Sequence, residues 1–157
     1  MREKTCCFTG HRELSDATQE SLYGAIYDAV LSLLSKGVTE FHSGGALGFD
    51  TAAALVVLDV KKLHPEVRLI LDLPCASQSK AWKTEDKQIY EYLLAVADET
   101  HILAPYYYKG CMQMRNRHMV DKSAYVISYC TKSTGGSAYT LRYDKESGCK
   151  IIELSGL

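Results

Sequence analysis

The sequence predicts an α/β protein with a Rossmann-like, three-layer fold, in which a mostly parallel sheet is flanked by helices. Short β-favouring apolar runs alternate with amphipathic stretches of about 10 to 15 residues, a pattern typical of parallel strands joined by helical crossovers. Turns rich in glycine and small hydroxyl residues follow several of the apolar runs. The alternation runs from end to end without a linker or low-complexity tract, so residues 1–157 are expected to form a single domain.

The first two units each combine a strand, a glycine turn and a helix. Residues 5–8 favour a strand that stops at Gly10, and residues 39–42 favour a second strand that ends in a glycine loop. The first helix keeps its apolar residues on one face and ends near Gly37. This face is formed by Leu22, Ala25, Ile26, Ala29, Val30, Leu33 and Leu34. The second helix has an equivalent face formed by Phe49, Ala52, Ala53, Val56, Val57 and Val60.

The rest of the chain continues the alternation. Residues 67–73 form a compact apolar strand ended by Pro74, and the helix that follows places Leu93 on its inner face. The next strand, 101–104, is stopped by Pro105. The remaining segments are expected, in order, as an aromatic loop (106–110), a basic helix (112–122), a strand (124–129), a loop (131–136), a helix (137–145) and a strand (150–154).

Composition and charge exclude several classes of protein. The 157 residues carry 18 Lys+Arg and 19 Asp+Glu, a formal net charge of -1 that does not favour a general polyanion binder. Any anion site must therefore be local. No apolar run reaches the roughly 20 residues of a membrane span, and the first residues lack the apolar core of a signal peptide. We therefore expect a soluble, cytoplasmic protein.

The cysteine and histidine patterns predict neither a disulfide framework nor a metal site. The six cysteines are scattered and include no C-x-x-C pair, which favours free thiols in a reducing compartment. The five histidines show no i,i+4 pairing and no clustering with cysteine of the kind that zinc sites use. From spacing alone we expect no bound metal.

Three loops after predicted strands have the composition of phosphate-binding turns, namely residues 9–12 (TGHR), 43–48 (SGGALG) and 133–137 (STGGS). Glycine lets backbone N–H groups approach a phosphate closely, and the N-terminus of a following helix favours negative charge. Asp50, at the start of the second helix, could hold its loop or a ligand hydroxyl. None of the loops matches the Walker or G-x-G-x-x-G patterns, so neither a Walker-type nucleoside triphosphatase nor a standard NAD dehydrogenase is indicated.

The segment 106–122 is locally basic, with four Lys or Arg against one Asp, a local charge of +3. Arginine suits phosphate oxygens, and the faces of Tyr106 and Trp82 could stack on a base or sugar. Arg115 and Arg117 lie two positions apart, so they point about 200° from each other on a regular helix. We expect Arg115 to face the ligand. We also expect Arg115→Ala to weaken phosphate binding about 10- to 100-fold with little loss of fold stability.

Five segments resemble YpsA-like proteins of the SLOG superfamily: residues 8–12 (FTGHR), 42–50 (HSGGALGFD), Trp82, 114–121 (MRNRHMVD) and 135–137 (GGS). The resemblance covers nearly the whole chain and implies a nucleotide or nucleotide-derived ligand on a Rossmann-like sheet. The residues then expected to bind it are Thr9, Gly10, His11, Arg12, Ser43, Gly44, Gly45, Asp50, Trp82, Tyr106, Arg115, Arg117, Gly135, Gly136 and Ser137.

The superfamily implies three alternatives for function. The first is a sensing or regulatory domain that binds ADP-ribose, NAD or a nucleoside monophosphate, with no cofactor of its own. The second is N-glycosidic hydrolysis of a nucleotide, as in the lonely guy phosphoribohydrolases. Their P-G-G-x-G-T-x-x-E motif lacks its glutamate here, where Arg142 stands, and Asp50, Asp121 or Glu146 would have to substitute. The third is single-stranded nucleic-acid binding, because residues 43–50 and 115–117 resemble motifs of the DNA-processing protein DprA. The oligomeric state stays open, a homo-oligomer included.

Overall fold

The computed structural model describes residues 2–14, 16–129, 143 and 148–154. Its strands are β1 (Thr5–Gly10), β2 (Glu40–Ser43), β3 (Arg68–Leu73), β4 (Glu99–Ile102), β5 (Tyr125–Tyr129) and β6 (Lys150–Glu153). Its helices are α1 (Asp16–Ser35), α2 (Phe49–Leu63), α3 (Thr84–Val96) and α4 (Cys111–Asp121), preceded by a short 3-10 turn, η1 (Arg2–Lys4). The predicted helix 137–145 falls almost wholly outside the described residues.

The described strands form one six-stranded sheet in the order β4-β3-β2-β1-β5-β6, and every neighbouring pair is parallel. The chain adds β2, β3 and β4 outward on one side of β1, then returns to place β5 on the other side. The strand order therefore reverses between β1 and β5. In open parallel sheets, ligands bind beyond the carboxyl ends of the strands at such a reversal.

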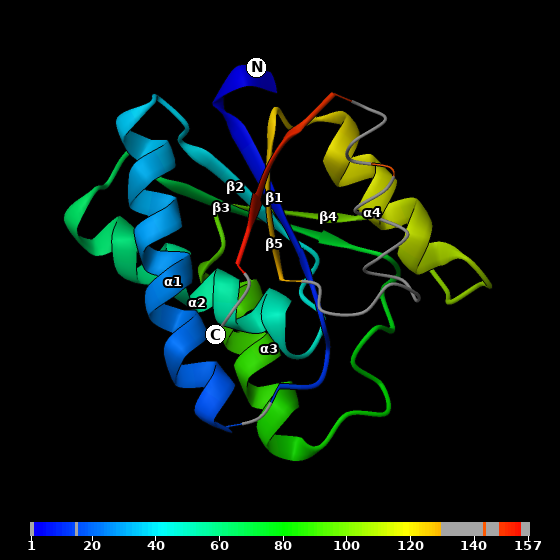
Figure 1. The fold of residues 1–157 in the computed structure, drawn as a ribbon. Coiled ribbons are helices and arrows are strands. Elements are labelled where there is room, and N and C mark those ends of the chain that lie inside the picture. The colour runs from blue at the N-terminus through cyan, green and yellow to red at the C-terminus, as the bar shows by residue number, and fades with distance from the viewer. Residues whose placement is uncertain (1, 15, 130–142, 144–147, 155–157) are drawn as a thin grey trace.

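Side-chain alternation along the strands assigns the helices to two layers. In β1, Cys6 and Phe8 belong to a large apolar core shared with α1, α2 and α3. Cys7, between them, belongs to a small cluster with Met119 and Val120 of α4. Because successive strand residues point to opposite faces, α1, α2 and α3 cover one face and α4 the other (Figure 1). The α/β, three-layer prediction is confirmed.

One strand is displaced from its prediction. The apolar run suggested residues 101–104, but β4 is Glu99–Ile102 and pairs with β3 from Ile70 opposite Glu99 onward. As an edge strand it is largely exposed, so the burial of its side chains does not determine which residues form the strand. Hydrogen bonding to β3 determines them. Among the described residues, no helix combines the length and apolarity needed to cross a bilayer.

Candidate functional site

A cavity of about 200 Å³ lies at the carboxyl end of β1, where the strand order reverses. Its walls come from the end of β1, from the loop and first turn around α2, and from the first turns of α4. The lining residues are Phe8, Thr9, Gly10, Arg12, Ala46, Asp50, Met112, Arg115 and Asn116. Two guanidinium groups and one carboxylate thus surround a small opening at the edge of the sheet.

The first two glycine loops pack tightly against each other. A Cβ atom on Gly10 would lie 2.4 Å from the Phe49 ring, and one on Gly48, whose φ is +78°, would lie 2.2 Å from the carbonyl oxygen of Arg12. The Phe49 N–H donates to the carbonyl oxygen of His11 across 3.0 Å. Glycine is required at both positions for close packing, and this packing fixes Arg12 at the mouth of the cavity.

Asp50 organises the second glycine loop while facing the cavity. The Ala46 N–H donates to its carboxylate oxygen Oδ2 across 3.3 Å, and the Ser43 hydroxyl donates to its carbonyl oxygen across 2.9 Å. Burial raises the pKa of Asp50, an effect that the positive charge of Arg115 partly offsets. The carboxylate therefore has both a structural partner in its loop and a face turned to the cavity.

Arg115 forms the inner wall of the cavity. Its side chain is only 3% exposed, and its Nη1 donates to the carbonyl oxygen of Gly44 across 2.6 Å. Its Nε donates to Oδ1 of Asn116 across 2.8 Å. Burial lowers the pKa of Arg115, the charge of Asp50 opposes this shift, and an arginine side chain stays protonated in proteins.

These contacts contradict the expectation that Arg115→Ala costs little fold stability. The alanine variant would leave the Gly44 carbonyl without its donor and open a void beneath the loop. The expectation failed because the partner of Arg115 lies 71 positions away in the sequence, on another loop.

The structure brings together some of the predicted residues. Thr9, Gly10, Arg12, Asp50 and Arg115 line the cavity. Three further predicted residues belong to the loop that packs against these side chains. The Ser43 hydroxyl donates to the carbonyl oxygen of Asp50, the Gly44 carbonyl accepts from Arg115, and the Gly45 N–H donates to the Ser43 hydroxyl oxygen. The structure thus gathers the first two predicted loops and the start of the basic helix at one place.

Other predicted residues are not among those that line the cavity in the described structure. Trp82 packs edge-on against Tyr90 with ring centroids 5.0 Å apart, and His11 packs in the same way against Tyr129 at 5.6 Å. Tyr106 is 78% exposed. Arg117 is not among the lining residues. The predicted residues Gly135, Gly136 and Ser137 lie outside the described residues.

Four lining residues were not predicted from the sequence to bind a ligand: Phe8, Ala46, Met112 and Asn116. Two of them carried a usable signal. Asn116 stands between the two arginines of the basic helix, and Met112 lies three positions before Arg115, on the same helix face. Phe8 and Ala46 are apolar residues beside the loops, and apolar residues in such places usually signal only packing.

The structure places one of the carboxylates considered for N-glycosidic cleavage at the cavity. Of the three carboxylates considered for cleavage, Asp50 lines the cavity, Asp121 accepts a hydrogen bond from Tyr143 elsewhere on the surface, and Glu146 lies outside the described residues. Among the described lining residues Asp50 is the only acid, and one of its oxygens is engaged by Ala46.

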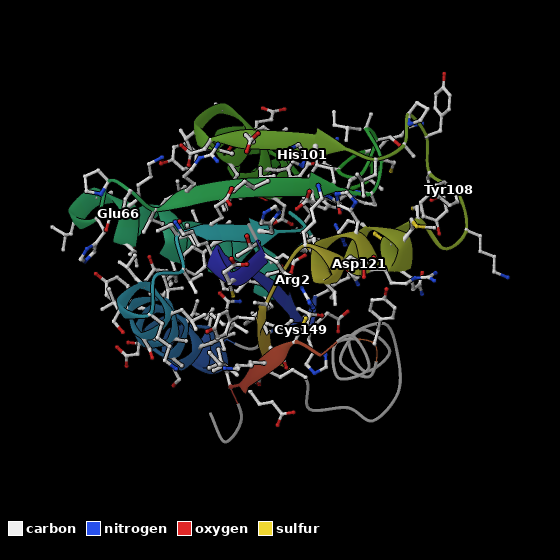
Figure 2. The ribbon with its side chains drawn as sticks, turned by 90° about the horizontal axis from the view of Figure 1, so that it is seen from above. Arg2, Glu66, His101, Tyr108, Asp121 and Cys149 are labelled. Carbon is white, nitrogen blue, oxygen red and sulfur yellow. The ribbon has the colours of Figure 1, made fainter. Side chains whose placement is uncertain are left out.

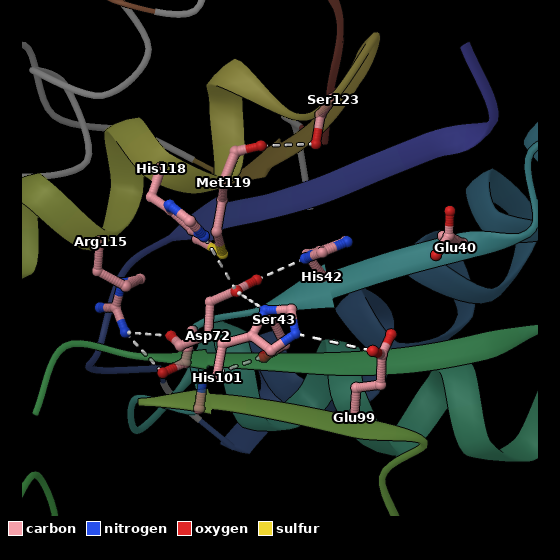
Figure 3. A network of polar contacts seen from close by, with 12 residues as sticks. Glu40, His42, Ser43, Asp72, Glu99, His101, Arg115, His118, Met119 and Ser123 are labelled. Carbon is pink, nitrogen blue, oxygen red and sulfur yellow. Dashed lines mark hydrogen bonds and ion pairs between the residues drawn. The ribbon is translucent and has the colours of Figure 1, made fainter. Parts of the chain in front are cut away.

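A separate group of ionisable side chains lies between the sheet and α4 (Figure 3). His42 on β2 and His101 on β4 contact the fully buried carboxylate of Asp72 on β3, at 2.5 Å and 3.1 Å. Burial alone would raise the pKa of Asp72, but the hydrogen bonds and charges of these two histidines outweigh it and lower the pKa. Burial, followed by the charge of Lys122, lowers the pKa of His118 on α4.

The parallel sheet, the order of its strands and the paired glycine loops at its reversal point define a Rossmann-like α/β protein. The profile of the YspA SLOG family matches residues 6–150. The chain belongs to this family, as the YpsA-like resemblance of its loop motifs had indicated.

Two relatives illustrate the family. An uncharacterised SPbeta prophage-derived protein of Bacillus subtilis, YoqJ, is 32% identical over 137 residues, covering 76% of this chain and 80% of the relative. A UPF0398 protein of Halalkalibacterium halodurans is 30% identical over 125 residues, and the match covers 78% of this chain and 66% of the relative. Neither name states an activity.

Two solved structures of DNA processing protein A share the fold. The protein from Streptococcus pneumoniae superposes with a TM-score of 0.69 at 19% identity, covering 98% of this chain and 50% of that protein. The protein from Helicobacter pylori, described for its single-stranded DNA binding mode, superposes with a TM-score of 0.67 at 20% identity, covering 99% of this chain and 67% of that protein. At these identities the likeness shows a common fold.

Proposed function

We propose that this chain is a cytoplasmic binding domain that takes the phosphate and sugar portion of a nucleotide or nucleotide-derived ligand in the cavity beside β1, in a sensing or regulatory role. One observation carries the proposal: two guanidinium groups, Arg12 and Arg115, and one carboxylate, Asp50, line a cavity at the strand-order reversal. In a chain of net charge -1, this local concentration of arginine favours an anionic ligand.

Each charged residue has a distinct part in the proposed complex. Arg12 is exposed at the mouth, so its guanidinium is accessible to a phosphate. Arg115 is held by the Gly44 carbonyl and contributes a fixed positive charge at the inner wall. Asp50 would accept a hydrogen bond from a sugar hydroxyl, because a carboxylate offers several acceptor positions.

The size of the cavity supports partial enclosure of the ligand. Its volume of about 200 Å³ is below the roughly 300 Å³ at which pockets for whole small ligands begin. A phosphate with its sugar fits that scale, and the base would then lie outside. The loop before α4, which carries Tyr108, lies at that end of the molecule and offers aromatic faces to such a base (Figure 2).

The first test is calorimetric titration of nucleotide-stripped protein with AMP, ADP-ribose and NAD. We expect one of these ligands to bind, and Arg12→Ala to weaken it about 10- to 100-fold, because a charge-assisted hydrogen bond contributes roughly 1.5 to 3 kcal/mol. Lys36→Ala is the matched control: it also removes one exposed positive charge, just after α1 and far from the cavity. Absence of binding at millimolar concentration across the set, or equal affinities for Arg12→Ala and wild type, would contradict the proposal.

Single-stranded nucleic acid is the second candidate ligand, favoured by the loop before α4. Tyr106, Tyr107 and Tyr108 are 78%, 66% and 45% exposed, and the exposed Lys109 follows them. Stacked bases on exposed aromatic rings, with a cation for the backbone, are the usual elements of single-strand recognition. The DNA processing protein A of Helicobacter pylori, which shares this fold, binds single-stranded DNA.

Fluorescence anisotropy with an oligo-dT strand at 50 and 200 mM salt separates the two candidates. If the strand is the ligand, affinity falls steeply with salt, and Tyr107→Ala weakens it about 5- to 100-fold, given roughly 1 to 3 kcal/mol per stacked base. Tyr92→Ala, which removes a 53% exposed tyrosine from α3, should leave the affinity unchanged. If oligo-dT does not bind while a mononucleotide does, the single-strand hypothesis is excluded.

A further inference from the structure

A compact set of metal-type ligands lies under α4, separate from the cavity beside β1. Asp72 of β3, His101 of β4 and His118 of α4 each offer one ligand atom, and these atoms lie within 4.8 Å of one another. Figure 3 shows the three side chains converging from the two strands and the helix. Three residues distant in the sequence thus bring two imidazole nitrogens and a carboxylate oxygen to one point.

The distances match the separations between ligands around a single ion. Bonds of about 2.0 to 2.1 Å to zinc place the corners of a tetrahedron roughly 3.3 to 3.4 Å apart. Oδ1 of Asp72 lies 3.1 Å from Nδ1 of His101 and 3.7 Å from Nε2 of His118. These two separations fall on either side of the tetrahedral value, and all three ligand atoms lie within 4.8 Å of one another, so side-chain rotations would have to bring the two imidazoles to their final spacing.

Further contacts orient the proposed ligands as in known metal sites. His42 donates from Nδ1 to Oδ2 of Asp72, which leaves Oδ1 to face the two other histidines. The Nε2 of His101 faces a carboxylate oxygen of Glu99 at 3.9 Å. Carboxylates and histidines behind the ligands are common at metal centres, where they fix the orientation and tautomer of each ligand. With its proton on Nε2, toward Glu99, His101 presents the lone pair of Nδ1 to the ion.

The third proposed ligand, His118, has a buried nitrogen, Nε2, without a hydrogen-bond partner among the described residues. Buried polar atoms of this kind are uncommon in folded proteins, because burial without a partner costs roughly 1 to 3 kcal/mol. Coordination by Nε2 would satisfy this atom.

An open cavity reaches the cluster from the side opposite the proposed nucleotide site. It has a volume of about 290 Å³, and its lining includes His42, Glu99, His101 and Lys122. Of the three proposed ligands, His101 lines this cavity, which therefore gives an ion a route to that side of the cluster.

We propose that Asp72, His101 and His118 bind one divalent transition-metal ion of the zinc type, with His42 as the positioning residue for Asp72. Two imidazoles and one carboxylate suit Zn²⁺, Co²⁺ or Fe²⁺, whereas Mg²⁺ and Ca²⁺ favour sets made of oxygen ligands. The proposal does not depend on the nucleotide cavity, which shares none of these three residues.

The test is titration of metal-stripped protein with Zn²⁺ in competition with a colorimetric chelator. We expect one ion per chain, an affinity loss of about 100-fold or more for His118→Gln and His101→Gln, and about 10- to 100-fold for His42→Gln. His64→Gln is the matched control, since His64 is an accessible histidine near Glu66, after α2. Thermal unfolding without metal establishes that each variant is folded, and His118→Gln should retain its midpoint because Nε2 has no hydrogen bond to lose.

Co²⁺ substitution supplies a second readout. Four-coordinate nitrogen and oxygen ligation gives visible d–d bands without the near-ultraviolet band of cysteine thiolate bound to cobalt. Those bands, lost in His118→Gln and kept in His64→Gln, support the site. A thiolate band, a stoichiometry well below one, or equal Zn²⁺ affinities for folded His118→Gln and wild type would overturn the proposal.

Discussion

At the scale of single residues, Gly44 and Arg115 share one small space. A Cβ atom on Gly44 would lie 2.5 Å from the guanidinium of Arg115 and 2.8 Å from a carboxylate oxygen of Asp50. Only a hydrogen atom fits there without displacing the buried arginine. The glycine of this loop is therefore a packing requirement of the site as well as a feature of phosphate-binding turns.

Gly44→Ala should lower the free energy of unfolding by about 1 to 3 kcal/mol, the usual cost of overpacking. Gly24→Ala is the matched control, because Gly24 lies within α1 and an added Cβ meets nothing within 4 Å. That substitution should raise the free energy of unfolding by about 0.5 to 1 kcal/mol through helix propensity. Urea denaturation measures both, and a Gly44→Ala protein as stable as wild type would refute the close packing.

The raised pKa of Asp50 predicts a pH dependence of stability. Because burial raises this pKa in the folded state above its ordinary value of about 3.9, the folded state holds the proton more tightly than the unfolded state. The contribution of Asp50 to stability is then most favourable below pH 4 and decreases as the pH rises through the folded-state pKa.

Asp50→Asn removes this titration. We therefore expect the free energy of unfolding of wild type, minus that of Asp50→Asn, to decrease as the pH is raised from 4, and then to level off. Urea denaturation at a series of pH values measures the difference. A difference that increases over this range would mean that the charges of Arg115 and Arg12 outweigh the effect of burial.

Some of the residues that line the cavity could be selected from the sequence alone. The motif that contains Arg115 and the loops that contain Arg12 and Asp50 could be selected because glycine and arginine have recognisable uses near phosphates. The burial of Arg115 could not be predicted, since its hydrogen-bond partner belongs to a distant loop. A ligand role for these residues stays a prediction.

At the scale of elements, α4 shares fewer buried apolar residues with the described part of the chain than α2 does. Among the described residues, the small core cluster on the α4 face of the sheet has four buried members: Cys7, Met119, Val120 and Val126. By contrast, α2 contributes six buried residues to the large core: Phe49, Ala53, Ala54, Val56, Val57 and Val60. Local opening is easier where fewer apolar contacts must be broken.

Native-state hydrogen exchange should therefore show a lower opening free energy for the amides of α4 than for those of α2. We expect a difference of at least about 1.5 kcal/mol, the contribution of one buried apolar side chain. The comparison requires protein free of nucleotide and metal. Equal protection of the two helices would show that polar contacts such as those of Arg115 anchor α4 as firmly as apolar packing anchors α2.

The elements predicted best were those with strong periodicity. The first helix was expected from its apolar face and its stop at Gly37, and α1 ends at Ser35. The strand β4 was placed two residues late, because its apolar flank at 103–104 lies beyond the paired residues. The residues that form an edge strand are determined by pairing with the neighbouring strand, and the hydrophobicity of the local sequence predicts that pairing poorly.

At the scale of the whole molecule, the fold was predictable because it repeats one simple unit many times. Each strand, turn and helix added an independent local signal for the same architecture. The cluster of Asp72, His101 and His118 was not predictable, and the histidine spacing even favoured no metal site. Its members come from β3, β4 and α4, and only the parallel arrangement of the sheet places them together.

Because Arg115 and His118 lie three positions apart on α4, the helix touches both proposed sites, and their binding equilibria should be coupled. An ion that immobilises this helix would reduce the entropy that a nucleotide must remove, so the coupling free energy should be favourable. Reciprocity then requires that Zn²⁺ raise nucleotide affinity by the same factor by which nucleotide raises Zn²⁺ affinity, about 5-fold or more. Titrating each ligand with the other at saturation measures both factors. If neither ligand changes the affinity of the other, the two sites bind independently although both include residues of α4.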